Sequence, residues 1–221
     1  FRLNGGSPFG AQGAYDSAFS GDTVLLTSGL RVCRPLSLQN STLDLTTAVP
    51  TDFYGNTYAV LGGLKGGQNW AVRDPTGGLS IGNNNKDTTY SGIMSGWSGQ
   101  VIPLIKIGTG ALTLTGANTY TGATTVNGGT LALSGANGTI ASSPGITISG
   151  GGTLKLDNTS AANNTNRIGD CAIVMSGGAF VFTNDAGAAN YSETVGGLTN
   201  AAGANIIAAA QAAGGRTNTL T

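Results

Sequence analysis

The clearest feature of the sequence is a pair of short alternating segments that occurs four times. Each pair has an apolar-x-apolar triplet, a polar turn that contains Gly or Asn, and a second triplet that begins five or six residues after the first one ends. Because side chains on a β-strand alternate between its two faces, this period of two predicts short strands with one buried face. The pairs are Leu36/Leu38 with Leu43/Leu45, Thr124/Val126 with Leu131/Leu133, Ile146/Ile148 with Leu154/Leu156, and Ile173/Met175 with Phe180/Phe182.

The residues between the apolar positions indicate which face is buried. Asp44 and Lys155 stand in the middle of two of the second triplets, where a charged side chain is tolerated if it points to water. The segment 108–116 has the same phase, with its leucines inward. We therefore predict one continuous core ladder, formed by Leu112, Leu114, Leu131, Leu133, Leu154, Leu156, Phe180 and Phe182.

The spacing of these strands predicts a stack of coils. Leu114, Leu133, Leu156 and Phe182 follow one another at intervals of 19, 23 and 26 residues, which are typical of the coils of a solenoid. One coil cannot bury its own apolar face, whereas stacked coils bury a continuous core. At about 22 residues and about 4.8 Å per coil, we expect roughly ten coils and a length of roughly 48 Å. A β-sandwich with strands at intervals of about 8 to 12 residues is the alternative architecture.

The composition excludes several other classes of protein. The 38 glycines and the low charge do not fit an ordinary helical domain, and the regular apolar positions argue against disorder. Ten basic residues balance ten acidic ones, so no positive surplus attracts nucleic acid. The absence of histidine removes Ser-His and Cys-His catalysis. The apolar stretch 101–107 is far shorter than the roughly 20 residues of a membrane helix, so we expect no membrane insertion by this segment.

One stretch of the chain resembles a known repeat. KIGTGALTLTGANTYTGATTVNGGTLALSG at 106–135 is similar to a nearly complete autotransporter-associated, or passenger-associated, β-strand repeat of bacterial surface proteins. DTTYSGIMSG at 87–96 resembles the segment that leads into this repeat. ETVGGLTNAAGANI at 193–206 resembles a later coil.

The resemblance covers the chain unevenly. It is fair over 79–105 and 136–207, and weak or absent over 1–35 and 46–78. It implies a right-handed parallel β-helix that is exported across the bacterial envelope, serves as a scaffold and shares no catalytic residues with its relatives. We expect residues 1–221 to be a single β-solenoid segment of a longer or processed surface protein, with 1–35 as an atypical N-terminal cap or interaction segment.

The acidic residues form no motif for catalysis or metal binding. No two of them lie within four residues of each other. Arg167 and Asp170 are expected to form a weak ion pair in a solvated turn, and GNNNKD at 82–87 to form a polar corner. We therefore predict no catalytic, metal or cofactor site. A polysaccharide-active enzyme would need acids from neighbouring coils to converge.

Trp70 and Trp97 are the candidate ligand-binding residues. Both lie in Gly-rich turns outside the paired triplets, and an aromatic ring can stack on a sugar ring or on a partner chain. The alternative for each is a ring that packs over the edge of the core. Tyr90 and Tyr120 precede Ser-Gly and Thr-Gly, and we interpret them as one corner that recurs in each copy of the repeat.

Two further segments allow specific expectations. Residues 201–215 are rich in alanine, which favours helix, but the glycines around them leave too short a run for a stable helix. We predict strand and turn there.

Cys33 and Cys171 are separated by roughly six coils, or roughly 30 Å, whereas a disulfide requires Cα atoms within about 7 Å. We predict no disulfide between them within one chain.

Together these patterns predict a structural protein and not an enzyme. A rod of low charge suits a cell-surface stalk or a filament subunit outside the bacterial cell. The strand edges at the ends of a solenoid are unpaired, so we expect self-association through those ends. The alternatives are an adhesin that binds glycans or a host protein, and a polysaccharide-active enzyme.

Overall fold

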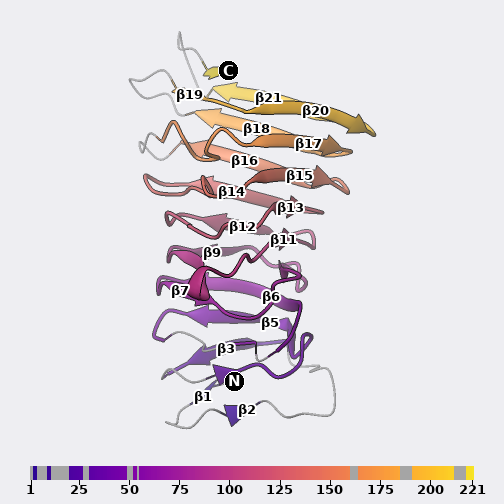
Figure 1. Cartoon of the computed structure of the whole chain (residues 1–221). Coiled ribbons are helices and arrows are strands. Elements are labelled where there is room, and N and C mark those ends of the chain that lie inside the picture. Colours follow the sequence, from indigo (N-terminus) through magenta and orange to yellow (C-terminus); the bar gives the residue numbers. More distant parts are fainter. Residues whose placement is uncertain are drawn as a thin grey trace.

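The chain folds as a parallel β-solenoid of about seven turns. The turns of the computed structural model stack from the N-terminal to the C-terminal end like the rungs of a ladder (Figure 1). The fold class is the predicted one, whereas the number of coils is lower than the expected ten. The structure describes residues 2–3, 9–10, 20–26, 30–48, 52–53, 55–159, 164–184, 191–211 and 218–221.

Two faces of the solenoid belong to one continuous parallel sheet. β6 (Ala59–Gly66) contributes to both, because its first residues pair with β8 and its last residue pairs with β9. The first face continues through β8 (Leu79–Ile81), β11 (Leu104–Lys106), β13 (Thr124–Val126), β15 (Gly145–Ser149), β17 (Ala172–Ser176) and β20 (Gly197–Ala202). The second face continues through β9 (Thr88–Tyr90), β12 (Ala111–Leu114), β14 (Thr130–Ser134), β16 (Thr153–Asn158), β18 (Ala179–Asn184) and β21 (Ile206–Gln211).

The remaining strands lie at the N-terminal end and on a third side of the solenoid. β5 (Leu38–Leu45) pairs with β6, and β3 (Asp22–Leu25) and β1 (Arg2–Leu3) follow it outward. The third side has shorter pairings, which join β2 (Phe9–Gly10) to β4 (Leu30–Arg31), β7 (Trp70–Val72) to β10 (Met94–Gly96), and β19 (Tyr191–Glu193) to β22 (Asn218–Leu220). The 3-10 turn η1 (Trp97–Gly99) follows β10. No helix in the described ranges has the length and hydrophobicity that a membrane span requires.

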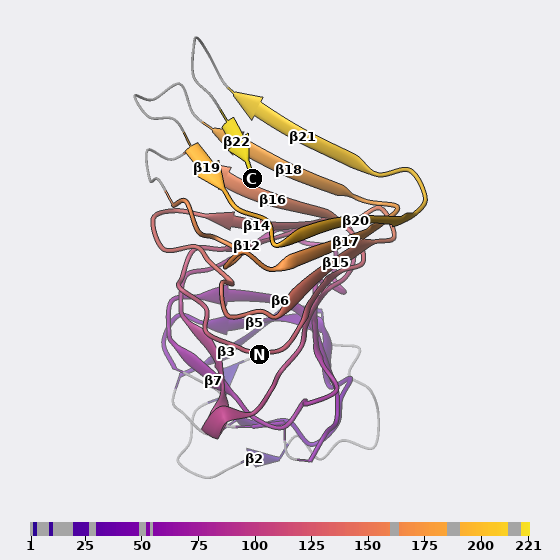
Figure 2. The same ribbon diagram turned by 45° about the horizontal axis from the view of Figure 1, so that its top comes forward.

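The coils differ in length. On the second face Leu112 pairs with Leu131, 19 residues later. Phe180 pairs with Ile207, 27 residues later. A uniform coil of about 22 residues therefore underestimates the chain that each turn uses towards the C-terminus. Figure 2 shows β20 and β21 as the last strands of the two faces, joined by a turn at one side of the stack.

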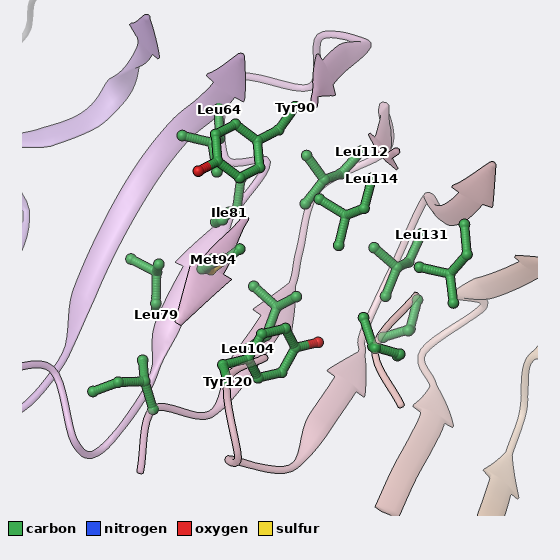
Figure 3. Close-up of a cluster of buried hydrophobic side chains, with 14 of the residues drawn as sticks. Leu64, Leu79, Ile81, Tyr90, Met94, Leu104, Leu112, Leu114, Tyr120 and Leu131 are labelled. Carbon is green, nitrogen blue, oxygen red and sulfur yellow. The ribbon is translucent and has the colours of Figure 1, made fainter. Parts of the chain in front are cut away.

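The apolar core runs along the solenoid axis between the faces. The pairing register aligns two columns on the second face, one through Leu112 and one through Leu114. Side chains from both faces and from the third side point into the same interior (Figure 3). The eight residues of the core ladder are each at most 1% exposed: Leu112, Leu114, Leu131, Leu133, Leu154, Leu156, Phe180 and Phe182.

Three smaller expectations have mixed outcomes. Residues 206–211 of the alanine-rich segment form β21, which confirms strand there, and 212–215 lie outside the described residues. Cys33 and Cys171 are both free cysteines, one half-buried and one buried. About half of the predicted N-terminal cap at 1–35 falls outside the described residues.

Candidate functional site

The two tryptophans lie in opposite environments. Trp70 on β7 is 1% exposed, and its ring centroid lies 5.8 Å from that of Phe53. The alternation of β7 places Trp70 and Val72 inside and Ala71 outside, so no face of the Trp70 ring is open to an outside ligand. The structure thereby removes Trp70 from the candidate ligand-binding residues. Trp97 is 44% exposed and is the candidate that the structure leaves.

Trp97 lies on a loop that leaves the regular path of the coil. Met94 lies level with Asn118 of the next coil, because the Thr119 backbone N–H donates to the Met94 carbonyl at 2.9 Å. The Met94 backbone N–H also donates to Asn118 Oδ1 at 2.9 Å. Leu104 pairs with Thr124. The chain thus takes ten residues to reach the first face in one coil and six in the next. The additional residues form η1, the short magenta turn beside β7 in Figure 1.

A column of charged side chains leads along the third side to Trp97. Arg31 Nε donates to Asp52 Oδ1 at 3.1 Å. The Arg73 guanidinium lies 4.0 Å from Asp52 Oδ2 and 3.7 Å from Asp74 Oδ1. Its central carbon is 4.3 Å from the centre of the Trp97 ring. A cation in this position is attracted to the ring face, so Arg73 holds the indole in place.

Hydrogen bonds join the loops of three successive coils at this corner. The backbone N–H of Gly55 donates to Asp74 Oδ2 at 3.1 Å, and the backbone N–H of Asp74 donates to Gln100 Oε1 at 3.0 Å. Asp74 and Ser98 have φ values of 85° and 49°, a region that residues other than glycine rarely adopt. Such conformations persist where the surrounding contacts fix them, and they cluster at functional sites.

The acidic residues of neighbouring coils converge on cations. Asp22 and Asp44 both contact Lys65 Nζ, at 2.6 and 3.3 Å. Asp52 lies between two arginines, as described above. In the part of the chain that the structure describes, no group of three or more Cys, Asp or Glu side chains could hold a metal ion. Because these carboxylates are paired with cations, the contacts favour a structural role for them over that of a catalytic acid–base pair.

The GNNNKD segment forms a polar corner, as predicted. Asn84 Nδ2 donates to the Thr42 hydroxyl at 2.9 Å, and Asn85 Oδ1 accepts from the Thr109 backbone N–H at 2.8 Å. Asn85 has a φ of 61°, which asparagine tolerates better than most residues. The amides of this corner therefore connect the coils before and after it.

Lys106 is a buried cation that the sequence analysis did not single out. It occupies an inward position of β11, where it pairs with Ile81 and Val126. Its Nζ donates to the carbonyl oxygens of Ile107 at 2.6 Å, of Gly108 at 3.3 Å and, in the next coil, of Gly128 at 3.3 Å. Burial lowers the pKa of Lys106 to about 8. Its stem completes the core, and its ammonium group joins two coils.

Arg167 corrects one prediction. It is fully buried, so the expected solvated ion pair with Asp170 is wrong. Its guanidinium donates to the carbonyl oxygens of Gly135 and Gly138 and to Asn158 Oδ1, at 2.5 to 2.9 Å. The backbone N–H groups of Arg167 and Ile168 both donate to the buried Glu193 carboxylate at 3.1 Å. Burial raises the pKa of Glu193, while these N–H donors and Arg167 favour its charged form.

Tyr90 and Tyr120 also differ from expectation, because they do not occupy equivalent positions. Tyr90 pairs with Leu114 on the second face, and its hydroxyl donates to the Gln68 carbonyl at 2.7 Å. The Tyr120 backbone N–H donates to the Met94 carbonyl on the third side. Both rings are buried. The interpretation of these residues as one recurring corner is therefore wrong.

Comparison with known proteins identifies one repeat in the chain. Residues 104–133 match the family model of the passenger-associated-transport-repeat. No curated protein and no solved structure matches the chain. The matched residues contain β11, β12, β13 and most of β14. This repeat and the parallel solenoid fit a passenger domain of an autotransporter. Trp97 lies outside the matched residues.

Proposed function

We propose that this chain is a structural β-solenoid outside the bacterial cell, where it acts as a surface stalk. One observation carries the proposal: both faces pair without interruption from β6 to the end of the sheet, straight through the residues that match the transport repeat. Each coil of such a protein contacts only its neighbours. Whole coils can therefore be added or removed to set the reach of the stalk.

A second proposal is that the 221-residue chain associates with other copies through the end of the solenoid. β20 and β21 are the last strands of the two faces in the described sheet. Their residues Leu198 and Ile207 pair with the buried Ile173 and Phe180, yet both are exposed. Free strand edges and exposed apolar side chains recruit further strands. This association would make the chain a filament subunit.

Removal of one complete coil tests the stalk. Deletion of residues 112–130 joins Ala111 to Leu131, which occupies the place of Leu112 in the next coil. We expect this variant to fold and to be shorter by about 4.8 Å, as measured by circular dichroism and small-angle scattering. Deletion of residues 112–120 is the control, because it removes part of a coil and should prevent folding.

Location and assembly need separate measurements. Antibodies raised against the chain should label intact bacteria, and labelling that requires permeabilised cells would contradict the proposed location. Light scattering coupled to size exclusion should show species larger than a monomer at high protein concentration, and Ile207→Lys should abolish them. A chain that stays monomeric would contradict the proposed filament and would still be compatible with the proposed stalk.

A further inference from the structure

We propose that the outer surface of the first face binds the same surface of a second copy of the chain, with the two solenoids side by side and pointing in the same direction. This lateral surface consists of the outward residues of β8, β11, β13, β15, β17 and β20. Figure 1 shows β11, β13, β15 and β17 stacked along one side of the solenoid. The contact is separate from the end-to-end association proposed above and does not depend on it.

Two columns of outward residues give the lateral surface its shape. The strand register aligns mostly β-branched side chains in one column, the ridge: Ser80, Ile105, Thr125, Thr147, Val174 and Thr199. Two positions earlier on each strand lies a column of glycine, alanine and one proline, the trough: Gly78, Pro103, Ala123, Gly145, Ala172 and Gly197. Because residues two positions apart point to the same face of a sheet, the ridge and the trough run side by side along the solenoid.

The lateral surface is accessible and carries no charge. None of the ridge residues is buried, and Val174 is 36% exposed. In the strands β8 to β20 of this face, all of which the structure describes, Lys106 is the single charged residue, and it points into the core. The outer side of the second face instead carries Lys155 and Asp157 on β16. Because the centres of protein interfaces are depleted of charge, the first face is better suited to contact an identical surface.

The ridge and the trough are complementary to each other. A two-fold axis that is parallel to the solenoid axis and lies between the two columns places the ridge of each copy over the trough of its partner. Each β-branched side chain then enters the space above a glycine, an alanine or a proline. A two-fold axis along the strands would instead press ridge against ridge. The shape of the surface therefore favours a second copy as the occupant and selects the parallel arrangement.

The size of the lateral surface predicts a weak dimer. Six strands of three to six residues, spaced by about 4.8 Å, give about 400 Å² of sheet in each copy. Stable complexes bury about 800 Å² per partner, so we expect a dissociation constant of about 0.1 to 1 mM. Copies that are held at the same end can adopt the parallel arrangement, and their high local concentration favours even a weak contact.

Sedimentation equilibrium tests the contact, with Ile207→Lys in every sample so that end-to-end association is absent. Size exclusion dilutes the sample and separates so weak a dimer, whereas sedimentation equilibrium can be measured up to about 1 mM. We expect a monomer–dimer equilibrium. Val174→Lys, in the ridge, should weaken the dimer by about tenfold or more, because two lysines meet at the same level. Thr113→Lys, on the outer side of the second face, adds the same charge and should leave the dimer unchanged. Circular dichroism would verify that each variant is folded.

Mixtures of two variants test the direction of the two copies. In the parallel arrangement, residue 174 of one copy lies level with residue 174 of the other. An equimolar mixture of Val174→Lys and Val174→Glu should therefore restore the dimer, because opposite charges then meet. In an antiparallel arrangement centred on β13, residue 174 would lie level with residue 80. Restoration of the dimer by Ser80→Glu instead of Val174→Glu would contradict the parallel arrangement.

Three further results would overturn the proposal. One is a chain that stays monomeric up to about 1 mM. Another is a folded Val174→Lys variant that dimerises as tightly as the parent chain. The third is an equal loss of dimer in Thr113→Lys, which would indicate a general effect of charge and no contact through the first face. Because every sample contains Ile207→Lys, these results do not bear on the end-to-end association or on the stalk.

Discussion

Two consecutive coils show how the scaffold and the surface of this protein differ. The coils that begin at β8 and β11 place their inward residues in register, with Leu79 opposite Leu104 and Ile81 opposite Lys106. They differ where the third side turns to the first face, because the earlier coil has the longer loop with Trp97. The core therefore restricts the strands and leaves the length of the corner free. A binding surface can be added to such a scaffold without a change in the core.

The largest effect is expected from a change in the core of the repeat. Leu133→Ala should lower the free energy of unfolding by about 2 to 5 kcal/mol, because it leaves a cavity in a column of fully buried side chains. Denaturant unfolding would measure the loss. Thr113→Ala, at an outward position of the same face, should change stability by about 0.5 kcal/mol or less. Equal effects at the two positions would show that the assigned faces are wrong.

A pair of glycine substitutions compares the two corners. A Cβ on Gly122 would lie 2.2 Å from the Ile102 carbonyl carbon, so Gly122→Ala forces adjacent coils apart and should cost about 1 to 3 kcal/mol or more. A Cβ on Gly99 would have no atom within 4 Å, although its φ is 79°. Gly99→Ala should therefore cost about 1 kcal/mol, from backbone strain alone. Thermal unfolding of both variants would test the order, and a greater loss at Gly99 would contradict it.

Lys106 should make the stability of the chain depend on pH in a specific way. Its pKa is about 8 in the folded chain, against an ordinary value of 10.5. Between these values the unfolded chain binds more protons, so the Lys106 contribution to stability rises with pH, by at most about 1.4 kcal/mol per unit. Lys106→Met keeps an apolar stem and cannot titrate.

The measurement is the difference in unfolding free energy between the unmodified chain and Lys106→Met, taken from pH 7 to 10. The subtraction cancels other groups, including Cys171, whose pKa burial raises to about 11. We expect the difference to shift in favour of the unmodified chain above pH 8. A difference that is constant across this range would show that the Lys106 ammonium is not destabilised by burial.

The smallest effect on stability is expected at Trp97. Trp97→Ala removes a half-exposed ring that contacts Arg73, and should change the unfolding free energy by about 0.5 kcal/mol or less. The emission spectrum should shift to shorter wavelength, because the buried Trp70 is then the sole tryptophan. A loss of several kcal/mol would indicate that the Trp97 loop supports the core, and would contradict the separation of scaffold and surface.

The sequence predicts the fold where local alternation and tertiary packing agree. From Leu112 to Phe182 the apolar positions repeat with a period of two, and the strands lie where that pattern places them. The length of each individual coil is less accessible, because turns of different length leave the strand pattern unchanged. The likeness of Tyr90-Ser-Gly to Tyr120-Thr-Gly was misleading for a related reason. In the stack, Gly92 lies against Gly116 of the next coil, whereas Gly122 lies against Ile102. The sequence of either triplet alone does not reveal which corner it forms.

Buried polar groups were the hardest part to predict. Arg167 lies in a polar stretch of sequence, and its burial depends on carbonyl groups that a neighbouring coil supplies from about 30 residues away. Lys106 follows an apolar run but has no local signal for its inward position. The column that ends at Trp97 has the same character, since Arg31, Asp52 and Arg73 meet only once the coils are stacked.

The bonds of Arg167 also determine how the solenoid comes apart. In a regular stack, the outermost coil can separate while those beneath it stay intact, so opening proceeds one coil at a time. Arg167 is bonded at once to the coil with Gly135 and Gly138 and, through its own N–H, to the later coil with Glu193. Separation that advances from the C-terminal end therefore breaks the Glu193 bonds first, and it breaks the guanidinium bonds only when the coil that carries Arg167 itself separates. Arg167 thus fastens its own coil to both neighbours, through its side chain on one side and its backbone on the other.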